Sequence, residues 1–213
     1  MARTADHEER RRQIAEAVCA LISQHGLDAV TVARTAATAG MSVGLVQHYF
    51  PAKDDMLLHA FRLVSQRIRG RIGQWIQSGV EHRRPIAAVL AEALAEFVPL
   101  DDQRRAEFRV ARAFAGRALD NPALAGVDVE TAGALRGDLA QAVHNGKECG
   151  EVATELDPWT AATRLAAVTE GLAIQVYRDA GATAVDVTTS IIAAELAAIF
   201  TGECRQYADN TSA

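Results

Sequence analysis

Residues 40–53 read GMSVGLVQHYFPAK and hold one short helix between two residues that break helices. Gly40 can adopt the left-handed conformation that closes a preceding helix, and Ser42 can cap the next helix by accepting a hydrogen bond from a free backbone amide. A helix over residues 43–49 is too short to be stable alone, and Pro51 ends it. A short helix after a glycine turn is typical of the second helix of a helix-turn-helix motif.

Two helices are expected before this motif. The first runs from about Glu8, after a polar and disordered lead over residues 1–7, to a stop at Gly26. Its first turns carry a cluster of three arginines over residues 10–12, which can lie along a DNA backbone or simply be solvated. Thr31 then caps a helix over 32–39, whose small side chains allow close packing on its neighbour.

These residues together resemble the DNA-binding signature of the TetR family of transcriptional regulators. The resemblance rests on the run TVARTAATAGMSVG (residues 31–44), on the HYF triplet at 48–50 and on Lys53, and it covers roughly the first 60 positions. Many family members have Tyr where this chain has Gln47. The sequence around Gln47 resembles the BetI-like branch of the family. This resemblance does not imply that the chain binds that branch's choline-linked ligand.

The charge of the chain is divided along its length. The net charge is −5 over 213 residues, but residues 1–84 hold 12 Lys and Arg against 8 Asp and Glu, whereas residues 85–213 hold 10 against 19. Only the first part is therefore expected to contact phosphate.

The remaining chain predicts an all-α fold of about nine helices without strands. A long helix is expected over 54–78, and by resemblance it connects the DNA-binding domain to the larger domain. Further helices follow at 85–97, 101–119, 129–143, 157–177 and from Asp186 onward, with a loop at 145–150. The predicted domains are a helix-turn-helix domain (1–53) and a helical ligand-binding and dimerisation domain (79–213).

DNA contacts divide by side-chain chemistry. Gln47 can pair with adenine through its amide and is the leading base reader. The expected DNA-binding set adds residues for thymine methyl groups, for phosphates and for the backbone at helix starts: Thr31, Arg34, Ser42, Val43, Gly44, Leu45, His48, Tyr49 and Lys53. Val46 and Phe50 are assigned to the core. A two-turn helix contacts few base pairs, so a homodimer on a palindromic operator is expected, with reading helices about 34–36 Å apart. The resemblance implies that the last two helices form the dimer contact.

A small-molecule effector is expected in the larger domain. Phe108, Phe114 and Trp159 are weak candidates for a pocket wall and Glu170 for a polar anchor, although such aromatic residues are more often core. Nothing in their spacing identifies the effector. Its proposed action is to favour a conformation in which the reading helices no longer match the groove spacing.

Other classes of protein fit the sequence less well. No catalytic triad motif, glycine-rich phosphate loop or metal-ligand spacing is found, so neither an enzyme nor a bound metal or cofactor is expected. The three cysteines (Cys19, Cys149 and Cys204) have no ligand-like spacing and are expected to be reduced thiols. No apolar stretch reaches about 18 residues, so the protein is expected in the cytoplasm without a membrane partner.

A repressor released by a ligand is the favoured function. A transcriptional activator, or a repressor without any ligand, remains open from sequence. An all-helical small-molecule-binding protein without DNA activity is the rival from another class.

Overall fold

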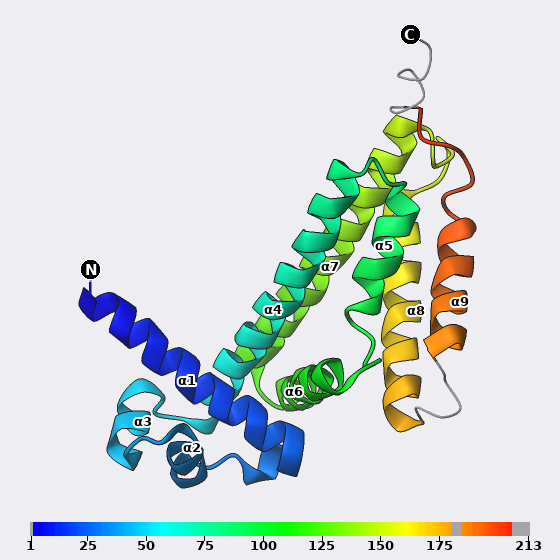
Figure 1. The fold of residues 1–213 in the computed structure, drawn as a ribbon. Helices are drawn as coiled ribbons and strands as arrows, with labels where there is room; N and C mark the ends of the chain where they lie inside the picture. The colour runs from blue at the N-terminus through cyan, green and yellow to red at the C-terminus, as the bar shows by residue number, and fades with distance from the viewer. Residues whose placement is uncertain (1, 180–184, 206–213) are drawn as a thin grey trace. The chain divides into compact units, whose positions relative to one another are not determined.

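The computed structural model describes residues 2–179 and 185–205, and for residues 2–5 the backbone alone. Within these residues the chain forms nine α-helices and no strand, which confirms the predicted all-α fold (Figure 1). The helices are α1 (Ala2–His25), α2 (Val32–Ala39), α3 (Val43–Tyr49), α4 (Lys53–Glu81), α5 (Ile86–Ala95), α6 (Asp102–Ala118), α7 (Pro122–Cys149), α8 (Pro158–Arg178) and α9 (Val185–Ala197), with a 3₁₀ helix, η1 (Leu27–Ala29), between α1 and α2.

The helices pack into two compact units, residues 1–68 with 101–128 (unit 1) and residues 69–100 with 129–213 (unit 2). The helices α4 and α7 each contribute to both units. This division by packing differs from the predicted domains because α6 packs on α1 in unit 1, although it follows the first helices by a long stretch of chain. The functional boundary after residue 53 stays a prediction.

Unit 1 has its own apolar core. Buried residues of α1 and α4 pack with Val46 and Phe50 of α3, as assigned from the sequence. From α6, Phe114 stacks on Phe61 of α4 with ring centroids 3.9 Å apart and an interplanar angle of 4°. The two helix-turn-helix elements therefore rest on a base made by α1, α4 and α6.

In unit 2, α9 packs on both α5 and α8 (Figure 1). The core is aliphatic and includes Leu94, Leu165 and Ile192 from these three helices. Arg164 on α8 also pairs with Glu195 on α9, with the Nε and Oε2 atoms 2.6 Å apart.

Several expected helix ends are wrong. The first helix begins at Ala2 instead of about Glu8, and pairs four residues apart, such as Asp6 with Arg10, support the extension. The last helix begins at Val185, so Asp186 lies in its first turn and is not its cap.

The largest correction concerns residues 145–150, which were expected to form a loop but continue α7 to Cys149. Gly146 is present for close packing: a Cβ there would lie 2.7 Å from a methyl group of Val152 and 2.8 Å from the ring of Phe200. The helix ends only at Gly150, whose φ of +95° favours glycine. No helix of the described residues is long and apolar enough to cross a membrane.

Candidate nucleic-acid interface

Hydrogen bonds at both ends of the turn fix the angle between α2 and α3. Thr31 Oγ1 accepts from the Arg34 amide at 3.2 Å and caps α2. At its other end Gly40 has the left-handed φ of 65°, and the Met41 amide donates to Ala36 O at 2.9 Å. Ser42 Oγ then accepts from the Leu45 amide at 3.2 Å and caps α3. The caps and the stop predicted at Thr31, Gly40 and Ser42 are thus all present.

One face of α3 is anchored in the core and the opposite face is free. Val46 is fully buried and Phe50 is 2% exposed. On the other side Val43, Gly44, Gln47 and His48 are exposed. Because α3 has only seven residues, its stability comes from these caps and two buried anchors rather than from helix propensity.

The other predicted DNA-binding residues lie at the start of α2, on or just before α3, and at the start of α4. Thr31, Arg34 and Ser42 are exposed, while Leu45, Tyr49 and Lys53 are half-buried. The Tyr49 ring makes edge contacts with His48 and with His7 of α1, at centroid distances of 5.4 and 5.3 Å. The structure thus brings the ten predicted residues together within unit 1, with His48 outside the core.

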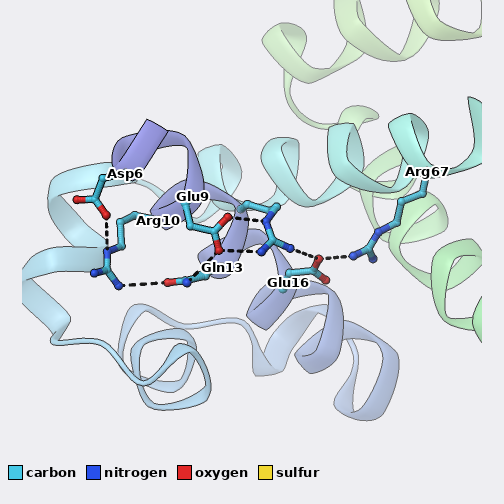
Figure 2. A network of polar contacts seen from close by, with 7 residues as sticks. Asp6, Glu9, Arg10, Gln13, Glu16 and Arg67 are labelled. Atoms are coloured by element: carbon cyan, nitrogen blue, oxygen red, sulfur yellow. Dashed lines mark hydrogen bonds and ion pairs between the residues drawn. The ribbon is translucent and has the colours of Figure 1, made fainter. Parts of the chain in front are cut away.

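Two of the three arginines at positions 10–12 of α1 form ion pairs with acidic neighbours (Figure 2). Arg12 donates two hydrogen bonds to Glu9, at 2.9 and 2.7 Å, and these lower the pKa of the Glu9 carboxyl. Arg12 also pairs with Glu16, which in turn accepts from Arg67 of α4. Since this charge is already offset within the protein, Arg12 is a weaker phosphate ligand than its sequence position indicates.

The first turn of α4 carries Lys53 and is held by α6. Asp54 accepts from Arg117 Nε at 2.9 Å and Nη2 at 3.0 Å, and from Asn121 Nδ2 at 2.8 Å. Hydrogen bonding from Arg117 lowers the pKa of Asp54, with burial opposing this shift. The Ala52 amide also donates to Asp55 Oδ2 at 3.1 Å. These bonds orient the helix start, where backbone amides and Lys53 can meet a phosphate.

The sequence alone did not reveal this role of Asp54 and Arg117. The partner of Asp54 lies 63 positions along the chain, so no local sequence pattern indicates the pair. A helix cap can be recognised from a few adjacent residues of the sequence, whereas a bidentate pair between distant helices cannot.

The four predicted ligand residues are divided between the two units. Phe108 and Phe114 belong to unit 1, where Phe114 is fully buried against Phe61. Trp159 and Glu170 belong to α8 of unit 2, and both are exposed, Trp159 by 53%. Their role in binding an effector therefore stays a prediction, and this arrangement does not add to it.

An open cavity of about 380 Å³ lies between α1 and α4 in unit 1, and none of those four residues lines it. Charged side chains dominate its lining, including Glu8, Arg11 and Arg62. His59 also lines it, and burial, followed by the charges of Arg11 and Arg62, lowers the His59 pKa. The lining does not resemble a mainly apolar effector pocket.

A buried carboxylate in unit 2 was also missed by sequence reasoning. Glu96 is 4% exposed, and its two oxygens accept from Arg71 Nε at 2.6 Å and from Trp75 Nε1 at 3.1 Å. The nearby guanidinium offsets the cost of burying this charge. The indole N–H of Trp75 therefore donates to this buried carboxylate.

Comparisons with known proteins agree with this geometry. Residues 14–60 match the family model for bacterial regulatory proteins of the tetR family, and residues 85–201 match the model for the C-terminal domain of BetI-type transcriptional repressors. The chain is 35% identical over 114 residues to the HTH-type transcriptional regulator PksA of Bacillus subtilis (strain 168), which covers 54% of each chain.

A second relative is the HTH-type transcriptional regulator BetI 1 of Chromohalobacter salexigens, with 38% identity over 81 residues, 36% of this chain and 40% of that protein. The chain thus spans about half the length, or less, of these curated relatives. Among solved structures, a transcriptional regulator from Rhodococcus sp. Rha1 matches with a TM-score of 0.77 and 27% identity, over 90% of this chain and 96% of that one.

The BetI-type model alone spans more than half of the sequence, and the model for the DNA-binding domain lies on the helix-turn-helix described above. Members of this family are DNA-binding regulators rather than enzymes, which confirms the expectation of a non-enzymatic protein, and they typically act as dimers. The chain belongs to the tetR family of bacterial regulatory proteins, with a C-terminal domain of the BetI-type repressors.

Proposed function

We propose that the chain is a transcriptional repressor that binds a palindromic operator as a homodimer and is released by a small molecule. The observation that carries this proposal is the exposed face of α3, held in place by the Ser42 cap and by buried Val46 and Phe50. This arrangement presents Gln47 and its neighbours to solvent on a rigid base, as insertion into a major groove requires.

Within this face, each residue is given the role that its chemistry allows. Gln47 reads adenine through paired hydrogen bonds, and Val43 and Leu45 contact thymine methyl groups. His48, Tyr49 and Lys53 contact phosphates. The residues at the helix starts, Thr31, Arg34, Ser42 and Gly44, approach the DNA backbone.

The proposed dimer contact uses α8 and α9. Large apolar side chains are exposed on α9, with Val185 53%, Val187 46% and Ile191 37% accessible. Val187 and Ile191 are one turn apart and share a face of the helix. An exposed apolar strip of this kind fits pairing with the same strip of a second copy, which a two-fold symmetric operator requires.

The effector acts through differential affinity. A ligand that binds more tightly to a conformation with mismatched reading helices lowers the population that can bind DNA. Phe108, Phe114, Trp159 and Glu170 remain the candidates for contacting it, to be tested by substitution once an effector has been identified in a thermal-shift screen.

The test is binding of the purified full-length protein to the DNA upstream of its own gene. We expect a complex with two chains per operator and an affinity that falls steeply as salt rises, because phosphate contacts release counterions. A protein that binds a small molecule but shows no salt-dependent DNA binding would instead support the rival class, and the proposal would be abandoned.

A further inference from the structure

The fold gathers three side chains of metal-ligand type at the end of α7. Cys149 is the last residue of α7, Glu151 lies in the turn that follows, and Cys204 comes from the segment after α9. Their ligand atoms all lie within 4.8 Å of one another. Cys149 is 8% and Glu151 3% exposed, and Cys204 is half-buried. The two cysteines are far apart in the chain, so sequence spacing gave no sign of this cluster.

Two glycines allow the two segments to meet. The Gly202 amide donates to Glu151 O at 2.9 Å. A Cβ on Gly202 would collide with the carbonyl group of Gly150, which itself has a φ of +95°. Because only glycine permits this contact between backbones, the position of Cys204 beside Cys149 is built into the fold and does not depend on loose side chains.

The carboxylate of the cluster is oriented by a third helix. Glu151 Oε1 accepts from the Ile86 amide at 3.1 Å and Oε2 from the Ala87 amide at 3.4 Å, at the start of α5. The residue before α5, Pro85, makes no side-chain cap. Glu151 thus satisfies free amides at the start of α5, and its Oε1 also accepts from the Cys149 thiol. Supporting hydrogen bonds of this kind orient metal-binding carboxylates.

One distance within the cluster fits a tetrahedral ion. Cys149 Sγ and Glu151 Oε1 are 3.5 Å apart. Zinc–sulfur and zinc–oxygen bonds of about 2.3 and 2.0 Å at a tetrahedral angle place the two ligand atoms about 3.5 Å from each other. A thiol donating to the carboxylate explains the same distance in the metal-free protein.

We propose that Cys149, Glu151 and Cys204 bind one Zn²⁺ ion per chain, with water in the fourth position. Two thiolates and one carboxylate form a donor set that suits zinc and excludes Mg²⁺ and Ca²⁺, which prefer oxygen ligands. The ion joins the end of α7 to the segment after α9 and adds a function to unit 2 that DNA binding does not require.

A disulfide between the two cysteines is the competing chemistry. Burial raises the pKa of the Cys149 thiol to about 11, with hydrogen bonding by Cys204 adding to the shift. Oxidation would join the two cysteines and remove both thiolate ligands, so a disulfide and a bound ion exclude each other.

The experiment titrates the reduced full-length protein with Co²⁺, a coloured substitute for Zn²⁺. We expect a thiolate-to-cobalt absorption band that saturates at one ion per chain and disappears when Zn²⁺ is added. Cys149→Ser and Cys204→Ser should each abolish the band, and Cys19→Ser should retain it. Cys19 is the matched control because its half-buried thiol lies in unit 1. Glu151→Gln keeps one acceptor oxygen for the amides of α5 and should weaken binding by more than about tenfold.

Native mass spectrometry tests the same site without substitutions. One bound Zn²⁺ should be accompanied by the loss of two protons per chain, one from each thiol. The proposal is overturned if no band forms, if both cysteine variants retain it, or if the two cysteines are found joined as a disulfide that binds no ion after reduction. None of these outcomes depends on DNA binding, so the proposed function is tested separately.

Discussion

The salt dependence of DNA binding should report the contact made by Lys53. This residue lies in the first turn of α4 and makes no ion pair within the described part of the chain. Each phosphate neutralised contributes about 0.9 to the slope of log affinity against log salt, so Lys53→Ala in a dimer should lower its magnitude by about 1.8. Between about 50 and 200 mM salt, the wild type should then lose about 12-fold more affinity than the variant.

Two control variants make this prediction specific. Lys53→Arg keeps the charge and should keep the slope. Arg12→Ala removes a cation that is already paired with Glu9 and Glu16, so it should leave the slope nearly unchanged. Fluorescence anisotropy at several salt concentrations measures all three variants. A Lys53→Ala slope equal to that of the wild type, or an Arg12→Ala slope that falls as far, would refute the assignment of phosphate contacts.

Three further variants test the reading helix, the support of α4 and the packing of α7. Gln47→Ala should relax base preference at one position of each half-site, where a good bidentate contact is worth about 1–3 kcal/mol. Binding to operators altered one base pair at a time measures this preference, and an unchanged preference would remove Gln47 as a base reader. Arg117→Ala should lower the melting temperature. The difference in melting temperature from wild type should be full above about pH 4 and shrink as the pH falls through the lowered pKa of Asp54. A difference that does not change with pH would count against a stabilising pair of Arg117 and Asp54. Gly146→Ala should destabilise the protein by about 1–3 kcal/mol through overpacking, as measured by denaturant unfolding. Gly137→Ala, in the open part of α7, should stabilise it by up to about 1 kcal/mol. Equal effects of the two substitutions would show that close packing does not explain the glycine at position 146.

Local signals made the helix-turn-helix predictable from sequence. Caps at Thr31 and Ser42 and the left-handed turn at Gly40 depend on hydrogen bonds within a few residues, and the structure contains each of them. Asp101 and Asp157, where two further helices were expected to begin, cap α6 and α8. Spacing within α3 likewise separated the buried Val46 and Phe50 from the exposed face.

Features that depend on distant segments were not predictable in the same way. Gly146 was interpreted as a turn residue because glycine has the same sequence signal whether it bends the chain or admits a neighbour such as Phe200. The stacking of Phe114 on Phe61 was not predicted, because a partner on α4 cannot be read from α6 alone. The meeting of Cys149 with Cys204 is a further case, since it depends on the path of the chain after α9.

Selection of bound DNA from a random pool with the purified full-length protein tests the central claim most directly. The account predicts enrichment of a palindrome whose half-sites are centred one helical turn, about 10–10.5 base pairs, or a multiple of it apart. It also predicts that Gln47→Ala selects a palindrome of the same spacing with one less defined position in each half. Failure to enrich any sequence, or enrichment of a site without two-fold symmetry, would contradict the proposal of a dimer reading DNA through α3.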